Sequence, residues 1–248
     1  VYHCFIDKNS IFITNSRKRN ILFSLDLDKL NNQIFKNRGI YLDNLIPSLL
    51  TFYTFCRNIK RVDFDESKIV DVIDNFVPLE YRLKLVGSFD KIDFYSDSKA
   101  TNLSATKSSL ETVKMQFKKT GINKFGLILL VGGIPKYLNR EEFWKELEHI
   151  ASEFKDDLVG VISFGKYSDM FINPFIKFSL KYMYAFSDLK SSFCKAVDLA
   201  LIERNNFEKI GILLAPGGAS FDEFSCAEER GKFYEKLIED FVLQNSKI

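Results

Sequence analysis

The sequence predicts an α/β protein whose larger part is a doubly wound domain built on a mostly parallel sheet. From residue 90 onward, strand-like apolar runs alternate with segments whose apolar residues recur every three or four positions, as in helices. Two of the runs, LILLV and GILLAP, are apolar at every position, which is typical of parallel strands covered by helices on both faces. Together these observations predict a Rossmann-like arrangement for the second part of the chain.

Composition and charge limit the classes of function that the chain can serve. Its 248 residues, of which 46% are hydrophobic, suffice for the core of one large or two modest domains. The 35 basic and 33 acidic side chains nearly cancel, so no global field favours nucleic acid or a membrane surface as partner. No apolar run approaches the roughly 18 residues that span a bilayer, and the four cysteines lack the close spacing of a metal site. The sequence therefore predicts a cytoplasmic protein with reduced thiols.

The first part of the chain has the pattern of an incomplete unit. Residues 3–14 alternate as in a β-hairpin. Residues 42–56 and 65–76 have the apolar spacing of two helices. The pattern then changes to two short strands around Gly87 and Ser88, so we place the boundary between domains at residue 87.

Strands and helices alternate throughout the second part. The expected strands lie at 91–96, 125–133, 158–165, 181–186 and 209–216. The expected helices lie at 103–117, 141–154, 167–171, 188–204 and 226–244. In such a sheet the loops that follow the strands lie at one edge, which is where ligands bind.

Three of these loops have an unusual composition. Each overlaps the end of an expected strand and continues into the loop after it. SDSKATN does so at the strand 91–96, GGIPK at the strand 125–133, and PGGASFDEF at the strand 209–216. Small residues let a ligand approach the backbone, and lysine or hydroxyl side chains suit an anion. Each loop alone is also compatible with an ordinary turn or a capped helix start. Their joint occurrence at strand ends favours a shared anion site.

The first loop carries two further signals. Asn102 precedes a helix and is expected to cap it, which would direct backbone donors and the positive end of the helix toward an anion. Asp97 would repel an anion, so ribose hydroxyls or a cation suit it better. The sequence contains no GxxxxGK[ST] loop, no GxGxxG fingerprint and no Ser, His and Asp set. A self-sufficient nucleotide site is therefore not expected.

The three loops resemble the signatures of a known family, the ATP-dependent Mur ligases of peptidoglycan synthesis, and in particular its D-glutamate-adding members. SDSKATNLSAT is similar to the motif that opens their third domain, LLVGGIPK to their glycine-rich lysine loop, and LLAPGGASFDEFSCAEERG to their last strand, loop and helix. The resemblance implies that residues 88–248 are the C-terminal amino-acid-binding domain. Residues 1–87 then resemble the end of the central ATP-binding domain, with PLEYRLK in the place of its terminal arginine motif.

The resemblance also implies an activity and roles for single residues. The family forms an acyl phosphate from the muramoyl-alanine carboxylate and ATP, and the D-glutamate amine then attacks it to give an amide and phosphate. By position, Asp97 would bind the ATP ribose, Arg82 the nucleotide phosphates and Asn44 the adenine. The residues expected to hold the D-glutamate carboxylates, with Lys99 also the expected catalytic residue, are Lys99, Thr101, Lys136, Ser220 and the backbone around Phe221.

Several positions depart from the family pattern. Tyr81 stands where the family has a histidine before its arginine, Ile134 where its glycine loop has an acid, and Ala227 where it has an aromatic residue. The resemblance implies that the UDP-binding domain, the phosphate-binding loop, the Mg²⁺ ligands and a modified lysine lie upstream of Val1. The chain by itself is therefore expected to be inactive, to hold no metal, and to supply the D-glutamate site and one wall of the ATP site.

The expected partners are small molecules, namely D-glutamate, UDP-N-acetylmuramoyl-L-alanine and ATP with Mg²⁺, and the expected state is a monomer. Two alternatives stay open. One is another ligase of the same superfamily, such as a folate polyglutamylating enzyme, against which the DSKATN core speaks. The other is a non-catalytic α/β module that senses a nucleotide or a dicarboxylate, and an upstream GxxxxGK[ST] sequence in the same frame would speak against it.

Overall fold

The protein forms two compact units, 1–78 and 79–248. The computed structural model describes residues 2–7, 10–15, 20–30, 40–60, 65–76, 80–136 and 139–245, and of residues 40–44, 60 and 66 it describes the backbone only. The boundary lies between residues 78 and 79, whereas the sequence suggested residue 87. The difference arises because β4 (Lys84–Phe89) pairs with β5 and so belongs to the sheet of the second unit. Which domains of a ligase the two units represent stays a prediction.

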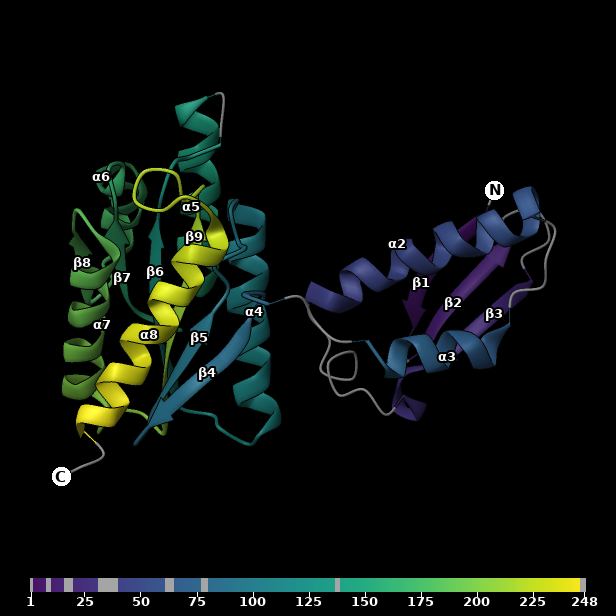
Figure 1. Ribbon diagram of the computed structural model, residues 1–248, viewed down its shortest axis with the longest axis horizontal. Coiled ribbons are helices and arrows are strands. Elements are labelled where there is room, and N and C mark those ends of the chain that lie inside the picture. The colour runs from purple at the N-terminus through teal and green to yellow at the C-terminus, as the bar shows by residue number, and fades with distance from the viewer. Residues whose placement is uncertain are drawn as a thin grey trace. The chain divides into compact units, whose positions relative to one another are not determined.

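Two helices pack on a three-stranded antiparallel sheet in the first unit (Figure 1). The expected hairpin and both expected helices are confirmed. The third strand was not predicted, although Phe23 and Leu25 alternate inward along it, because a run of six residues gives only a weak period. The elements are β1 (Tyr2–Asp7), β2 (Ser10–Asn15), β3 (Ile21–Asp26), η1 (Leu27–Lys29), α2 (Ile40–Phe55), the π-helical turn η2 (Cys56–Lys60) and α3 (Glu66–Asp74).

A six-stranded sheet, in the order β4-β5-β9-β6-β7-β8, forms the centre of the second unit. β4 runs antiparallel to β5, and all the other pairs are parallel. The expected mostly parallel sheet is thus confirmed. Besides β4, its strands are β5 (Ile92–Ser96), β6 (Phe125–Gly132), β7 (Leu158–Phe164), β8 (Tyr182–Ala185) and β9 (Lys209–Gly217).

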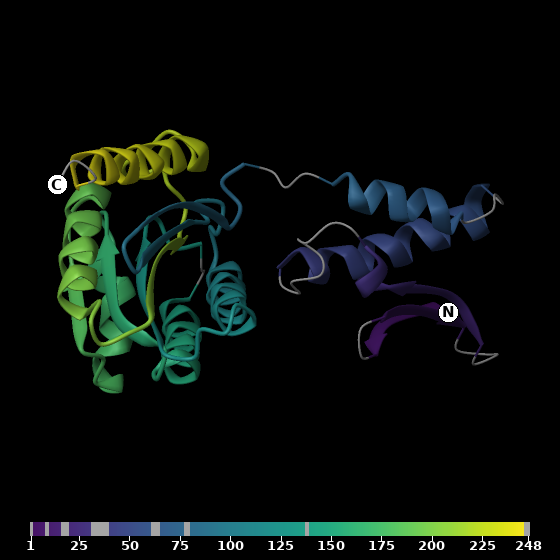
Figure 2. The ribbon, with the colours of Figure 1, turned by 90° about the horizontal axis from the view of Figure 1, so that it is seen from below.

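Helices cover both faces of this sheet, as Figure 2 shows for the yellow α8 on one side and the teal helices on the other. One core contains side chains of α4, α5 and α6, and a second contains side chains of α7 and α8. The helices are α4 (Leu103–Lys119), α5 (Arg140–Phe154), α6 (Ser168–Ile172), the 3-10 helix η3 (Asn173–Phe178), α7 (Leu189–Glu203) and α8 (Ala227–Asn245).

The strand β6 explains why its sequence is apolar at every position. Leu127 and Leu129 belong to the core beneath α4 and α5, whereas Ile128 and Leu130 belong to the core beneath α7 and α8. All four side chains are fully buried. The prediction from uninterrupted apolar runs is therefore confirmed for a doubly wound domain.

The turn between β4 and β5 differs from the sequence prediction. It lies at Asp90 and Lys91, whereas Gly87 and Ser88 are inside β4. Asp90 has φ 54°, a left-handed conformation that aspartate tolerates better than most residues. Gly87 instead follows an irregularity in the pairing of β4 with β5, a common place for glycine in a strand.

The strand order places the three unusual loops side by side. β9, the last strand in sequence, lies between β5 and β6, so the loops after β5, β9 and β6 follow adjacent strands. Asn102 caps α4 as expected, because its side-chain oxygen accepts a hydrogen bond from the Ala105 N–H at 2.8 Å. These loops form the candidate site.

Candidate functional site

Backbone hydrogen bonds join the three loops to one another. The N–H of Gly217, the last residue of β9, donates to the carbonyl of Ala100, after β5, at 2.8 Å. Ile134, after β6, and Ala219, after β9, form an isolated antiparallel bridge with hydrogen bonds of 2.7 and 2.8 Å. The loop after β9 is thus fixed to both of its neighbours.

Two glycines make this close approach possible. A Cβ at Gly133 would lie 2.3 Å from the carbonyl oxygen of Ala219, and Gly133 has φ 94°. A Cβ at Gly218 would lie 2.6 Å from the carbonyl oxygen of Gly132. No other residue fits at either position without moving backbone, so the small residues of these loops bring backbone against backbone.

Two of the predicted anion-binding side chains touch. Lys136 Nζ donates to Thr101 Oγ1 at 2.8 Å, which joins the loop after β6 to the loop after β5. The lysine is exposed and the threonine half-buried. A cation and a hydroxyl so placed form one clamp for a carboxylate or phosphate oxygen.

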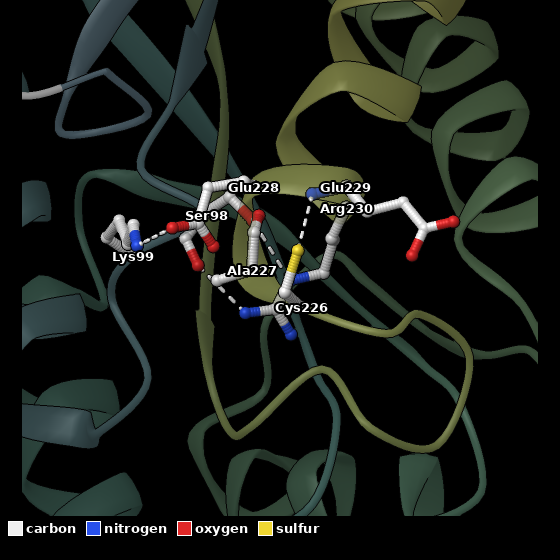
Figure 3. A network of polar contacts seen from close by, with 7 residues as sticks. All are labelled: Ser98, Lys99, Cys226, Ala227, Glu228, Glu229 and Arg230. Atoms are coloured by element: carbon white, nitrogen blue, oxygen red, sulfur yellow. Dashed lines mark hydrogen bonds and ion pairs between the residues drawn. The ribbon is translucent and has the colours of Figure 1, made fainter.

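A second polar network joins the loop after β5 to the start of α8 (Figure 3). Lys99 Nζ forms an ion pair with Glu228 Oε1. Its neighbour Ser98 donates through Oγ to the carbonyl of Ala227 at 2.7 Å. Both residues of the loop therefore engage the first turn of the last helix.

Arg230 lies at the centre of this network and is completely buried. Its Nε donates to Ser98 Oγ at 3.0 Å and one of its terminal nitrogens to the Ser98 carbonyl at 2.8 Å. The other terminal nitrogen donates to the Gly218 carbonyl at 3.2 Å. One side chain thus ties the loops after β5 and β9 to α8.

Arg230 keeps its positive charge although it is buried. Burial lowers the pKa of Arg230 to about 10, and the carboxylates of Asp222 and Glu223 oppose this shift. The guanidinium therefore stays protonated at neutral pH. Asp222 in turn accepts a hydrogen bond from the Lys166 N–H at 3.1 Å, which ties the loop after β7 to the same site.

Asp97 faces inward at the end of β5 and is 1% exposed. Ser109 Oγ donates to its carboxylate at 2.6 Å. Burial raises the pKa of Asp97 above its ordinary value, while the Ser109 hydroxyl, the Leu83 N–H and the Arg82 charge each act to lower that pKa. The carboxylate thus holds α4 and the segment before β4 against the loop.

Comparisons with known proteins identify relatives of this chain. No protein-family model matches the chain. A UDP-N-acetylmuramoylalanine–D-glutamate ligase of Petrotoga mobilis is 26% identical over 212 residues, which cover 85% of this chain and 41% of that protein. The enzyme of the same name from Rickettsia conorii is 30% identical over 180 residues, 72% of this chain and 31% of that protein.

The chain is a homologue of these ligases. It spans less than half the length of either protein. A solved structure of Mycobacterium tuberculosis folylpolyglutamate synthase aligns with 94% of this chain and 47% of that chain, with a TM-score of 0.57 at 9% identity. This likeness supports the α/β fold.

The structure brings the predicted D-glutamate residues to one edge of the sheet. Lys99, Thr101, Lys136 and Ser220 all lie in the three joined loops. Ser220 is 2% exposed, and its carbonyl accepts the Phe224 N–H at 2.8 Å. The next side chain, Phe221, is 69% exposed. Their roles toward a ligand stay predictions.

The predicted nucleotide residues divide between the two units. Arg82 and Asp97 belong to the second unit and lie close enough for the arginine charge to lower the pKa of the aspartate. Asn44 belongs to α2 of the first unit, and its side chain lies outside the described residues. The structure therefore joins two of the three.

The positions that depart from the family pattern have structural partners. The Tyr81 carbonyl accepts the Lys99 N–H at 3.2 Å, and its ring packs so tightly that a Cβ at Gly231 would lie 2.3 Å from a ring carbon. Ile134 contributes its backbone to the bridge with the loop after β9. Ala227 supplies the carbonyl that accepts from Ser98. All three contribute to holding the loops.

Sequence reasoning missed the residues that support the loops. Arg230, Glu228 and Ser109 carried no assigned role, although the CAEERG segment that contains the first two was part of the quoted signature. An arginine near the start of a helix, where the helix dipole disfavours a cation, was the available signal for an unusual partner.

Two features are absent from the described part of the chain. There, no three His, Cys, Asp or Glu side chains group closely enough to hold a metal ion. Within the same residues, no helix is long and apolar enough to cross a membrane.

Proposed function

We propose that the chain is part of an ATP-dependent ligase that adds D-glutamate to UDP-N-acetylmuramoyl-L-alanine in peptidoglycan synthesis. The homologues that carry this name support the reaction. The observation that supports the site is the hydrogen bond from Lys136 to Thr101, which joins two loops 35 residues apart in sequence. It presents a cation and a hydroxyl to one small anionic group.

D-Glutamate fits this site because it carries two carboxylates and one amine. Lys136 and Thr101 would hold one carboxylate, and Lys99 with Ser220 would hold the other. A lysine ammonium has three donors and makes strong charge-assisted hydrogen bonds to carboxylates. With both carboxylates held, the amine has one direction left in which to attack, and such orientation can remove several kcal/mol of the barrier.

The proposed chemistry takes place in two steps. The muramoyl-alanine carboxylate takes the terminal phosphate of ATP, which releases ADP and leaves an acyl phosphate. The D-glutamate amine then attacks the acyl carbon, so that an amide forms, phosphate leaves and the amine loses a proton. Lys99 would act in this step by stabilising negative charge near the reacting atoms.

Nucleotide binding is proposed for three further residues. Arg82 would contact phosphates and Asn44 the adenine, as the resemblance implies. Asp97, whose carboxylate also accepts the Ser109 hydroxyl, would bind the ribose. The structurally similar folylpolyglutamate synthase was solved with ADP and AMPPCP. Mg²⁺ ligands are expected outside this chain, and we therefore propose that the chain alone does not catalyse.

The setting of the reaction follows from its substrates. We expect a monomer that acts in the cytoplasm on small molecules, without nucleic acid or a membrane surface as partner. Homology to ligases favours this function over a non-catalytic sensor. A folate polyglutamylating activity stays the alternative, and an assay of amino-acid acceptors with the complete enzyme would separate the two.

The proposal is tested by titrating the 248-residue chain with D-glutamate and L-glutamate by calorimetry. Lys136→Ala should weaken D-glutamate binding about tenfold or more, because a charge-assisted hydrogen bond is lost. Lys118→Ala is the matched control, since Lys118 is exposed in the last turn of α4, and it should bind as the wild type does. Equal affinity for the two enantiomers, or unchanged binding by Lys136→Ala, would contradict the proposal.

A further inference from the structure

The two lysines of the site differ in what neutralises them. Lys136 donates to a neutral hydroxyl. Lys99 is instead paired with the carboxylate of Glu228, a residue 129 positions away in sequence. Of the two lysines proposed to hold a dicarboxylate, one is therefore already paired with a carboxylate of the protein.

The contact between Lys99 and Glu228 is held from both sides (Figure 3). Ser98 Oγ donates to the carbonyl of Ala227, directly before Glu228. Arg230, two residues after it, donates to Ser98. These bonds fix the first turn of α8 against the loop, so the acid faces the lysine because of the fold and not through a chance surface encounter.

Both partners remain accessible to a ligand. The side chain of Lys99 is 29% exposed and that of Glu228 is 45% exposed. Ion pairs at such partly exposed positions are weak, because water competes for both charges. A ligand carboxylate with a second contact at Lys136 can therefore displace the acid.

We propose that Glu228 holds Lys99 in the place of a ligand carboxylate and is exchanged for it when a dicarboxylic amino acid binds. This inference rests on the proposed function of the same site. Glu228 then sets the specificity of the site, because its charge repels any anion that approaches Lys99. A ligand that is also held at Lys136 can overcome this repulsion.

The test is a double-mutant cycle read out as the affinity of the 248-residue chain for D-glutamate and for glutarate. Glu228→Gln should tighten binding about three- to tenfold, the range expected for a partly exposed charge pair. In a Lys99→Gln background the same substitution should change affinity less than about twofold, because the lysine through which it acts is gone.

Glu229→Gln is the matched control. Glu229 lies in the same helical turn and carries the same charge, but its carboxylate accepts from Ser225. It should leave affinity unchanged. Unchanged or weaker binding by Glu228→Gln, an equal gain by Glu229→Gln, or a gain that persists without Lys99 overturns the exchange.

The use of two ligands, D-glutamate and glutarate, separates this inference from the proposed function. If Glu228→Gln tightens both ligands and the wild type does not prefer D-glutamate over glutarate, the exchange stands and the D-glutamate assignment falls. If D-glutamate is preferred but no variant gains affinity, the assignment stands and the exchange falls. Absence of binding to every variant overturns both.

Discussion

Arg230 is the residue on which the arrangement of the site depends most. It is a fully buried cation whose direct partners are neutral oxygens of Ser98 and Gly218. Each of these oxygens would lose its donor if the guanidinium were removed, and a buried acceptor without a donor is costly. The arginine positions the loops and does not itself face a ligand.

Arg230→Met should lower the free energy of unfolding of the second unit by about 2–4 kcal/mol, because three buried acceptors lose a charged donor. Arg230→Lys should lose less stability, because it keeps the charge. Some loss remains, because a lysine cannot make the three hydrogen bonds of the planar guanidinium. Urea unfolding followed by the fluorescence of Trp144, the one tryptophan of the chain, reports on this unit. The exposed Lys232 offers a control in Lys232→Ala, and an equal loss there would contradict the assignment.

The two lysines of the candidate site were predictable from the sequence, whereas the arginine that supports their loops was not. Lys99 and Lys136 stand in loops whose local composition indicates an anion site. Arg230 bonds Ser98 across 132 residues, and no local pattern encodes such a partner. The composition of a loop can therefore indicate a candidate anion site, whereas the contacts that hold the loop in place depend on the whole fold.

At the scale of elements, the start of α4 links stability to the site. Asn102 caps the helix through the Ala105 N–H, and it follows Thr101 of the lysine clamp directly. Asp65 caps α3 of the first unit in the same way, because its carboxylate accepts a hydrogen bond from the Ser67 N–H at 3.0 Å. The two caps are equivalent locally, but only the first belongs to the three joined loops.

Asn102→Ala and Asp65→Ala should each cost about 1 kcal/mol of stability in the unit that holds the residue, the usual loss for an N-cap. Asn102→Ala should also weaken D-glutamate binding, because the segment that carries Thr101 loses its anchor to the helix. Asp65→Ala should leave that affinity unchanged. Urea unfolding and calorimetric titration of both variants check this pair, and equal effects on binding would show that the α4 cap has no special place in the site.

Elements were predictable from period and composition, but their order in space was not. The run GILLAP indicated a buried strand correctly, yet nothing in it shows that β9 lies between β5 and β6. The turn at Asp90 was missed because Gly87 and Ser88 are stronger turn formers by type. There, pairing of β4 with β5 outweighs local preference.

At the scale of the whole molecule, each unit has a core of its own. Among the described residues, the hydrophobic cluster of the first unit, with the partly buried side chains packed against it, draws on residues from Tyr2 to Ile73. The two clusters of the second unit draw on residues from Leu83 onward. A unit with its own buried core has what it needs to fold alone.

A fragment of residues 79–248 should therefore fold by itself and bind D-glutamate with the affinity of the 248-residue chain. The reason is that Lys99, Thr101, Lys136 and Ser220, with the buried arginine that supports their loops, all lie within this range. Circular dichroism, the fluorescence of Trp144 and calorimetry check the fold and the affinity separately. A folded fragment with weakened binding would show that the first unit contributes to the amino-acid site, which would contradict a D-glutamate site built from the second unit alone.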